Sequence, residues 1–223
     1  ARWEPARPLP DGPFDLVLAG HVLNELYGDD LAARARLVEA MLARLSPGGL
    51  VVLVEPALRE TSRALLALRD RLVAAGATVR APCLYRGDCP ALVRPGDWCH
   101  AERAWTAPPL VSELAHAAKL HRETLKMSYL VLQAPGAPWP PVPAGRLFRI
   151  VSEPLPQKGQ HRYYGCGPEG RVPLVLPHKH VRDHNRAFTE LERGEIVRID
   201  RLEPRGDGLR LDADSKVEPI AKK

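Results

Sequence analysis

Cysteine is scarce in this chain, and the spacing most often used for zinc is missing. Only four cysteines occur among 223 residues, and none of the gaps is the C-x2-C of common zinc ribbons. Cys83, Cys89 and Cys99 share one short Pro- and Gly-rich stretch at C-x5-C and C-x9-C spacings, and Cys166 lies far downstream. Four thiols fit one tetrahedral metal or iron–sulfur site with none left over. Such a site would tie a distant C-terminal segment to the middle of the chain.

Long apolar runs are also missing. No run approaches the ~18 residues that a membrane-spanning helix needs, so we expect no membrane partner. No secretory or transit segment opens the sequence, which argues against disulfides. The sequence begins at Ala1 without a Met, so we expect a fragment or a processed product. We find no internal repeat.

The composition is that of an ordinary globular protein. Hydrophobic residues make up 45% and charged residues 26%, and the length suits one large domain or two small ones. The net charge of +5 is compatible with a nucleic-acid partner, because phosphate contacts need cations. The same modest excess of Arg also fits a GC-rich genome without such a partner.

The N-terminal part alternates strands and helices. The expected order is a strand at 14–19, a helix from Asp29 or Asp30 to Leu45, a strand at 50–54, a helix from Thr61 to Gly76 and a strand at 77–80. This alternation predicts an α/β fold with a parallel, doubly wound sheet.

The next segments complete this predicted first domain, which covers residues 1–134. A Cys-rich loop at 81–105 is followed by a helix at 109–126 and a strand at 127–133. Residues 135–145 are proline-rich and predict a stiff linker.

Beyond the linker, residues 146–223 show a different pattern. Short strand candidates separated by turns lie at 147–151, 161–164, 171–176, 195–199 and 209–211. Five short strands in this length predict a small β-barrel of the OB or a related type.

Two segments resemble class I S-adenosylmethionine methyltransferases. Residues 14–26, FDLVLAGHVLNEL, resemble the fourth strand and its turn, and residues 45–56, LSPGGLVVLVEP, resemble the fifth strand. Together with the cysteine set and Ser128–Leu132, the match narrows to the methyltransferase-like family of small-ribosomal-subunit proteins found in bacteria and mitochondria. The resemblance covers essentially the whole chain.

That resemblance implies a Rossmann-like class I methyltransferase sheet and an OB-like domain, with a role in assembling the small ribosomal subunit. It also implies a 4Fe–4S cluster held by Cys83, Cys89, Cys99 and Cys166. The implied partners are small-subunit rRNA and ribosomal proteins, for a monomer in the bacterial cytoplasm or the mitochondrial matrix. Departures from the family pattern occur at Leu84, at Ala101 and at residues 122–127.

A four-thiolate site would leave no open coordination position and would therefore be structural. The spacings and the resemblance favour a cluster, and zinc is the alternative. Four unrelated buried thiols would be the plainest explanation. We expect His100 to donate a hydrogen bond to sulfur and not to be a ligand.

Catalytic features are missing from the sequence. The turn after the first strand, at Ala19, Gly20 and His21, is where this fold would receive S-adenosylmethionine, or would form a plain turn. No Gly-rich cofactor loop and no Asn-Pro-Pro-Tyr motif occur, so the cofactor would need an N-terminal part that this sequence lacks. We expect no methyl transfer by this chain. An active rRNA methyltransferase and a zinc-stapled nucleic-acid-binding module are the rival hypotheses.

Residues that could bind RNA gather in the second domain. Basic side chains can hold phosphates and tyrosine rings can stack on bases, although any single one of them is more often a core or solvated-surface residue. The candidates are Arg146, Arg149, Lys158, His161, Arg162, Tyr163 and Tyr164.

Overall fold

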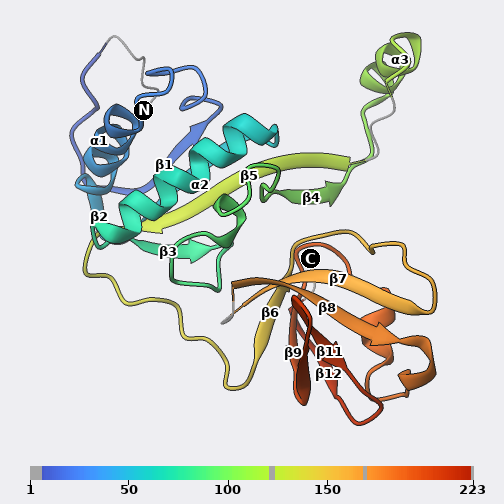
Figure 1. The fold of residues 1–223 in the computed structure, drawn as a ribbon. Helices are drawn as coiled ribbons and strands as arrows, with labels where there is room; N and C mark the ends of the chain where they lie inside the picture. Colours follow the sequence, from blue (N-terminus) through green and yellow to red (C-terminus); the bar gives the residue numbers. More distant parts are fainter. Residues whose placement is uncertain (1–6, 121–123, 168–169, 222–223) are drawn as a thin grey trace.

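The chain folds around two β-sheets, and the computed structural model describes residues 7–120, 124–167 and 170–221. A five-stranded sheet and its helices form the N-terminal unit, and a seven-stranded sheet forms the C-terminal unit. Figure 1 shows the two units one beside the other, connected by a long segment without helix or strand. Within the described residues, no helix is long and apolar enough to cross a membrane.

The N-terminal sheet mixes parallel and antiparallel pairing. Its order is β1 (Phe14–Gly20), β2 (Leu45–Pro56), β5 (Thr124–Gln133) and β3 (Thr78–Ala81), with β4 (Ala101–Ala104) paired to the start of β5. β1 and β2 run parallel, whereas β5 runs antiparallel to both β2 and β3. The prediction of an all-parallel sheet was therefore wrong at β5.

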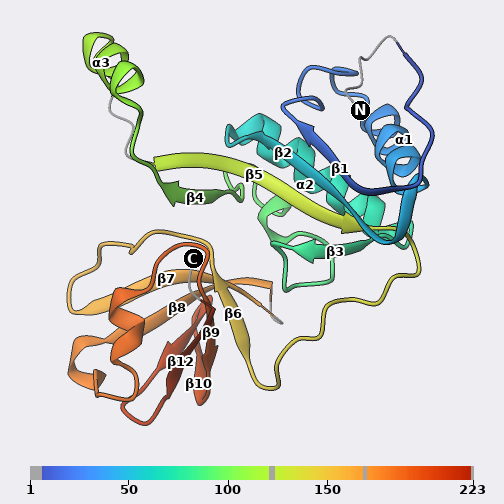
Figure 2. The same ribbon diagram turned by 180° about the vertical axis from the view of Figure 1, so that it is seen from behind.

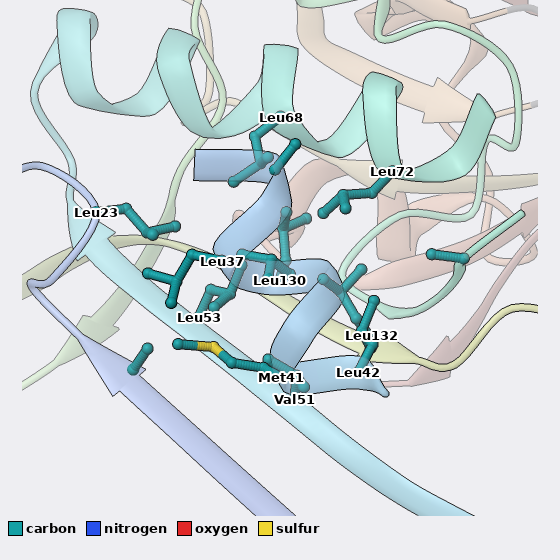
Figure 3. Packing of buried hydrophobic residues seen from close by; sticks show 14 of the residues in the cluster. Leu23, Leu37, Met41, Leu42, Val51, Leu53, Leu68, Leu72, Leu130 and Leu132 are labelled. Atoms are coloured by element: carbon teal, nitrogen blue, oxygen red, sulfur yellow. The ribbon is translucent and has the colours of Figure 1, made fainter. Parts of the chain in front are cut away.

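Two helices cover one face of this sheet. α1 (Leu31–Leu42) begins at Asp30, whose carboxylate accepts a hydrogen bond from the Ala33 N–H at 2.9 Å. α1 and α2 (Arg59–Ala74) share a buried apolar cluster with β2 and β5, in which Leu53 and Leu132 are fully buried. Figure 3 shows side chains of this cluster meeting between the helices and the strands.

The opposite face of the sheet is only partly covered. Leu16 and Leu18 on β1 are 58% and 68% exposed, although they alternate with the buried Ala19. Because α1 and α2 lie on the same face, the described helices do not form the doubly wound arrangement that the sequence predicts.

The sequence predicts the C-terminal end of α2 correctly but not its start. Thr61 does not cap the helix, because α2 starts at Arg59 and the Thr61 hydroxyl donates to the Pro56 carbonyl at 2.6 Å. Gly76 closes the helix as expected, with a left-handed φ of 91°. The Ala77 N–H then donates to the Leu72 carbonyl, which completes the C-terminal cap.

The third helix is shorter than the sequence suggests. A single helix at 109–126 was wrong, since α3 spans Pro109–Ala117 and residues 124–127 pair with β4. Figures 1 and 2 show α3 projecting away from both units, and none of its residues is buried.

The C-terminal sheet contains seven strands in the order β10-β11-β8-β7-β6-β9-β12. The strands are β6 (Leu147–Ile150), β7 (Gln160–Gly167), β8 (Gly170–Pro177), β9 (Ile196–Ile199), β10 (Leu202–Arg205), β11 (Gly208–Leu211) and β12 (Val217–Ala221). The sequence missed β10 and β12. The sheet wraps around a second apolar cluster that includes Phe148, Leu174 and Phe188.

The first half of the proline-rich linker is attached to the N-terminal unit. The Thr78 hydroxyl donates to the Ala137 carbonyl at 2.5 Å, and Arg86 donates to the Pro140 carbonyl at 3.1 Å. Trp139 packs against the N-terminal core, with the Arg86 guanidinium 5.3 Å from its ring centre. The linker therefore becomes independent of this unit only after Pro140.

The two faces of the N-terminal sheet should respond differently to truncation. We expect Leu53→Ala to lower the free energy of unfolding by about 2–5 kcal/mol, because it leaves a cavity in the core. Leu18→Ala, on the exposed face, should change the free energy by less than about 0.5 kcal/mol. Urea unfolding measures both, and equal losses would show that the outer face is covered in solution.

Candidate metal centre

All four cysteines line one cavity of about 70 Å³ between the two units. Cys83 follows β3, Cys89 precedes a short 3-10 turn at Pro90–Leu92, and Cys99 precedes β4. Cys166 comes from β7 of the C-terminal unit. The structure thus brings the distant fourth cysteine to the same cavity as the other three.

The alternation of β7 decides which of its side chains reach the cavity. Tyr163 and Gly165 face the core of the C-terminal unit, so Tyr164 and Cys166 lie on the opposite, outward face. Cys166 stands between Arg149 on β6 and Arg171 on β8 in the strand register.

An arginine–aspartate pair on α2 holds the first part of the Cys-rich loop. Arg69 is 1% exposed, contacts the Asp70 carboxylate at 2.7 Å, and donates to the carbonyls of Tyr85 and Gly87. The other Asp70 oxygen accepts a hydrogen bond from the Cys89 N–H at 2.9 Å. The pair therefore fixes the backbone at Cys89 and between it and Cys83.

Arg63, six residues before Arg69 on α2, holds the second part of the loop. Its guanidinium donates to the carbonyls of Ala91, Leu92, Arg94 and Asp97 at 2.6–3.2 Å. A planar guanidinium with five donors is suited to collecting several carbonyl oxygens. This contact sets the path of the chain between Cys89 and Cys99.

The thiols lie in an environment that disfavours their charged forms. Burial raises the pKa of Cys89 to about 12 and that of Cys99 to about 11, and the charges of neighbouring cysteines act in the same direction. Burial also raises the pKa of Cys166, and the other three cysteines raise it further. A metal would have to displace protons from these thiols on binding.

Cations surround the cavity. Arg149, Arg171 and Arg193 from the C-terminal unit and Arg69 from the N-terminal unit all line it. Arg69 also lowers the pKa of Cys83, against the stronger opposite effect of burial. A group that carries net negative charge, such as a thiolate-ligated cluster, would be stabilised by these four guanidinium groups.

Two ion-pair contacts join the units beside the cavity. Arg171 contacts the Asp97 carboxylate at 2.6 Å and lies 4.0 Å from the centre of the Tyr164 ring. Arg193 contacts Glu102 on β4 at 3.3 Å, and Glu102 also contacts Lys126 at 2.5 Å. Glu102 is only 7% exposed, so its contact is shielded from solvent.

His100 faces the same cavity. Burial, together with the charge of Arg193, lowers its pKa to about 4, so the ring is neutral at pH 7. Its Nδ1 is buried and has no hydrogen-bond partner among the described residues, and its Nε2 lies 3.9 Å from Glu102. A neutral ring nitrogen with no partner could donate a hydrogen bond to a group inside the cavity, as a sulfur acceptor would require.

The arrangement is looser than a mononuclear metal site. In the parts of the chain that the structure describes, no group of three or more His, Cys, Asp or Glu side chains is placed to hold a metal ion. A tetrahedral zinc site with bonds of about 2.3 Å draws its sulfur atoms to about 3.8 Å from one another. The cysteines of a 4Fe–4S cluster bind four different irons and stand further apart. Four thiolates are a donor set that both kinds of site use.

The residues predicted to bind S-adenosylmethionine do not line the cysteine cavity. Ala19 and Gly20 line a hollow of about 480 Å³ along β1, on the side away from β2. A Cβ atom at Gly20 would meet nothing within 4 Å, so its backbone is open to approach. His21 is exposed, and its N–H donates to the Val54 carbonyl at 2.8 Å.

The residues predicted to bind RNA do not form one surface. Lys158 is exposed and Arg162 is half-buried on the C-terminal sheet. Arg149 lines the cysteine cavity, and Tyr164 lies beside that cavity under Arg171. His161 lies against His178, with ring centres 4.7 Å apart, and Arg146 is half-buried near the Leu202 carbonyl at 3.5 Å.

The prediction that Tyr163 stacks on bases was wrong. It is 1% exposed and its ring packs edge-on against Phe188 at 5.2 Å. The even–odd register of β7, which the sequence alone does not fix, turns this side chain into the core.

The residues that support the site were missed by the sequence analysis. Arg63, Arg69, Glu102 and Arg193 carry the contacts around the cavity. One signal was present: Arg69 follows Leu65 by four residues and Leu68 by one, so it falls on the apolar side of α2. A charged residue in that position indicates a buried partner.

The Glu102 contact predicts a change of stability in acid. Burial alone would raise the pKa of Glu102, but hydrogen bonding to Lys126 and to Glu153, together with the charge of Arg193, outweighs it and lowers the pKa from 4.5 to about 2. A lowered folded-state pKa stabilises the fold above the unfolded value, and this stability disappears as the pH falls from about 4.5 to about 2.

Glu102→Gln should therefore lower the free energy of unfolding at pH 7 by about 1.5–3 kcal/mol and flatten its dependence on pH in that acid range. Glu113→Gln on the exposed α3 is the matched control. Urea unfolding at pH 7, 4.5 and 3 tests the prediction, and identical profiles for the two variants would contradict it.

Comparison with known families identifies the chain. Residues 4–209 match the family described as mitochondrial small ribosomal subunit Rsm22. A comparison with curated proteins found no match. Because the family match covers most of the chain, this protein belongs to the mitochondrial small ribosomal subunit Rsm22 family.

Proposed function

We propose that this chain acts in assembly of the mitochondrial small ribosomal subunit, as a scaffold that binds ribosomal RNA. The carrying observation is that a member of this family places four cysteines, from both of its units, around one cavity. The proposed location is the mitochondrial matrix, and the proposed partners are small-subunit rRNA and ribosomal proteins.

The cavity is proposed to hold a 4Fe–4S cluster through Cys83, Cys89, Cys99 and Cys166. Such a group supplies binding free energy, on the order of 10 kcal/mol for structural metal sites, that becomes folding energy. Three ligands belong to the loop that Arg63 and Arg69 hold, and the fourth belongs to β7. Binding would therefore fix the two units against each other.

The N-terminal unit is proposed to be a class I methyltransferase-like sheet. In support, the antiparallel β5 lies between β2 and β3, whose directions are parallel to each other. The C-terminal unit is proposed to be related to OB-type barrels, because its sheet curves around a single core. In the order of pairing, however, β10 and β12 stand at opposite ends of the sheet.

A scaffold role is favoured over methyl transfer because Glu55, at the end of β2, already bonds the turn that follows β1. The buried Glu55 carboxylate accepts hydrogen bonds from the backbone N–H groups of Val22, Leu23 and Asn24 at 2.9–3.2 Å. The only acidic side chain of β2 therefore braces the turn after β1 and has little capacity left for a substrate.

Anaerobic purification tests the cluster. We expect about four irons and four sulfides per chain, with visible absorption and little zinc, and we expect Cys166→Ser to lose most of the iron. Gln160→Ala, on the same strand, is the control and should retain it. Limited proteolysis of the linker beyond Pro140 should proceed faster in Cys166→Ser, because the C-terminal unit is then held less firmly.

Three outcomes would count against the proposal. Zinc without sulfide would replace the cluster by a zinc site. A chain free of iron and zinc would remove the metal centre altogether. Equal iron contents in Cys166→Ser and Gln160→Ala would show that Cys166 is not a ligand.

A further inference from the structure

A second concave site lies on the outward face of the C-terminal sheet. This groove has a volume of about 340 Å³, and its polar lining consists of Gln157, Gln160, Arg162, Arg205, Asp207 and Arg210. Its floor is formed by Pro173, Val175 and Pro177 of β8. The metal cavity shares none of these residues.

The strand register explains why these side chains gather. Val175 on β8 stands opposite Arg162 on β7 and opposite Arg210 on β11, so both guanidinium groups flank the same floor residue. Leu174 and Leu176, the alternate residues of β8, point into the core. The groove is therefore built on a rigid, packed sheet.

The groove carries an excess of positive charge that the described residues do not neutralise. Among them, Arg162, Arg205 and Arg210 form no ion pair. Asp207, in the turn between β10 and β11, lines the groove, and Glu203 stands opposite Arg210 in the register. Three guanidinium groups thus face two carboxylates.

The hydrogen bonding of Arg162 points more specifically to an anionic ligand. Its Nε is buried and has no partner among the described residues, and its Nη1 contacts only the Gln157 side chain at a long 3.4 Å. A buried donor without an acceptor is costly and is usually satisfied by a ligand or by water. An anionic oxygen in the groove would satisfy it.

The groove also continues toward an aromatic ring. Gln160, Arg162, Tyr164 and Cys166 alternate along the same outward face of β7. The Arg162 guanidinium lies 5.8 Å from the centre of the Tyr164 ring, and Arg171 lies 4.0 Å from it. A half-buried tyrosine therefore stands between the groove and the metal cavity.

We propose that this groove binds the sugar–phosphate backbone of single-stranded RNA. Guanidinium groups hold phosphate oxygens through paired hydrogen bonds, and the two glutamine amides can bond ribose hydroxyls or base edges. Tyr164, half-buried at the end of the groove, adds an aromatic ring of the kind on which unpaired bases stack. This inference rests on the proposed rRNA-binding function and assigns it a site.

Fluorescence anisotropy of the full chain with a 12-nucleotide uridine RNA tests the assignment over a series of potassium chloride concentrations. We expect Arg205→Gln/Arg210→Gln to weaken binding about tenfold or more at low salt. The slope of log K against log salt should fall by about 1.4, since each single-strand phosphate contact contributes about 0.7. Arg205→Lys/Arg210→Lys should keep most of the slope.

The matched control is Arg36→Gln/Arg59→Gln, which removes the same charge from exposed positions on α1 and α2. Equal weakening in both double variants would overturn the groove assignment, because only net charge would then matter. Unchanged binding in the groove variant of a chain that binds RNA would also overturn it, while leaving the proposed function intact.

Two further results are decisive. Failure of the unsubstituted chain to bind the RNA would count against the proposed function itself. If poly-glutamate binds the unsubstituted chain but not the groove variant, and RNA binding is the same in both, the groove is a protein site and the inference is wrong. Circular dichroism and thermal unfolding of each variant establish that the fold is retained.

Discussion

The interaction on which the candidate centre depends is the pair of guanidinium contacts from α2 to the Cys-rich loop. Arg63 and Arg69 gather six backbone carbonyls of a segment that has almost no regular structure. Without these donors, the carbonyls would need water, and the loop would have no defined path. A packed helix therefore holds the backbone between the three cysteines, and Cys83 itself packs against the core of the same unit.

In the C-terminal unit, the strand β7 holds the functional side chains in place. Its inward residues, such as Tyr163, fix it in the core, so its outward residues have defined positions. Cys166 at one end and Arg162 nearer the other are separated by Tyr164 on the same face. The metal cavity and the basic groove are therefore rigidly connected, and the ion pairs of Arg171 and Arg193 orient that strand against the N-terminal unit.

The sequence predicted what local rules determine. Continuous apolar runs gave β1 and β2, Asp30 identified the start of α1, and Gly76 the end of α2. The sequence-based prediction failed where contacts with distant parts of the chain determine the structure. Residues 124–126 follow a helical pattern but pair with β4. The side of β7 on which Tyr163 lies likewise depends on register. The cysteines could be grouped by their number and by family resemblance, but the arginines around them require the tertiary fold.

The anchored linker changes the thermodynamics of contact between the units. Since Ala137 to Pro140 are held against the N-terminal unit, only residues 141–146 remain as a tether before β6. A tether this short maintains an effective concentration on the order of millimolar. The two halves of the cavity are therefore never far apart, and an interface too weak to hold separate molecules together is sufficient to close it within one chain.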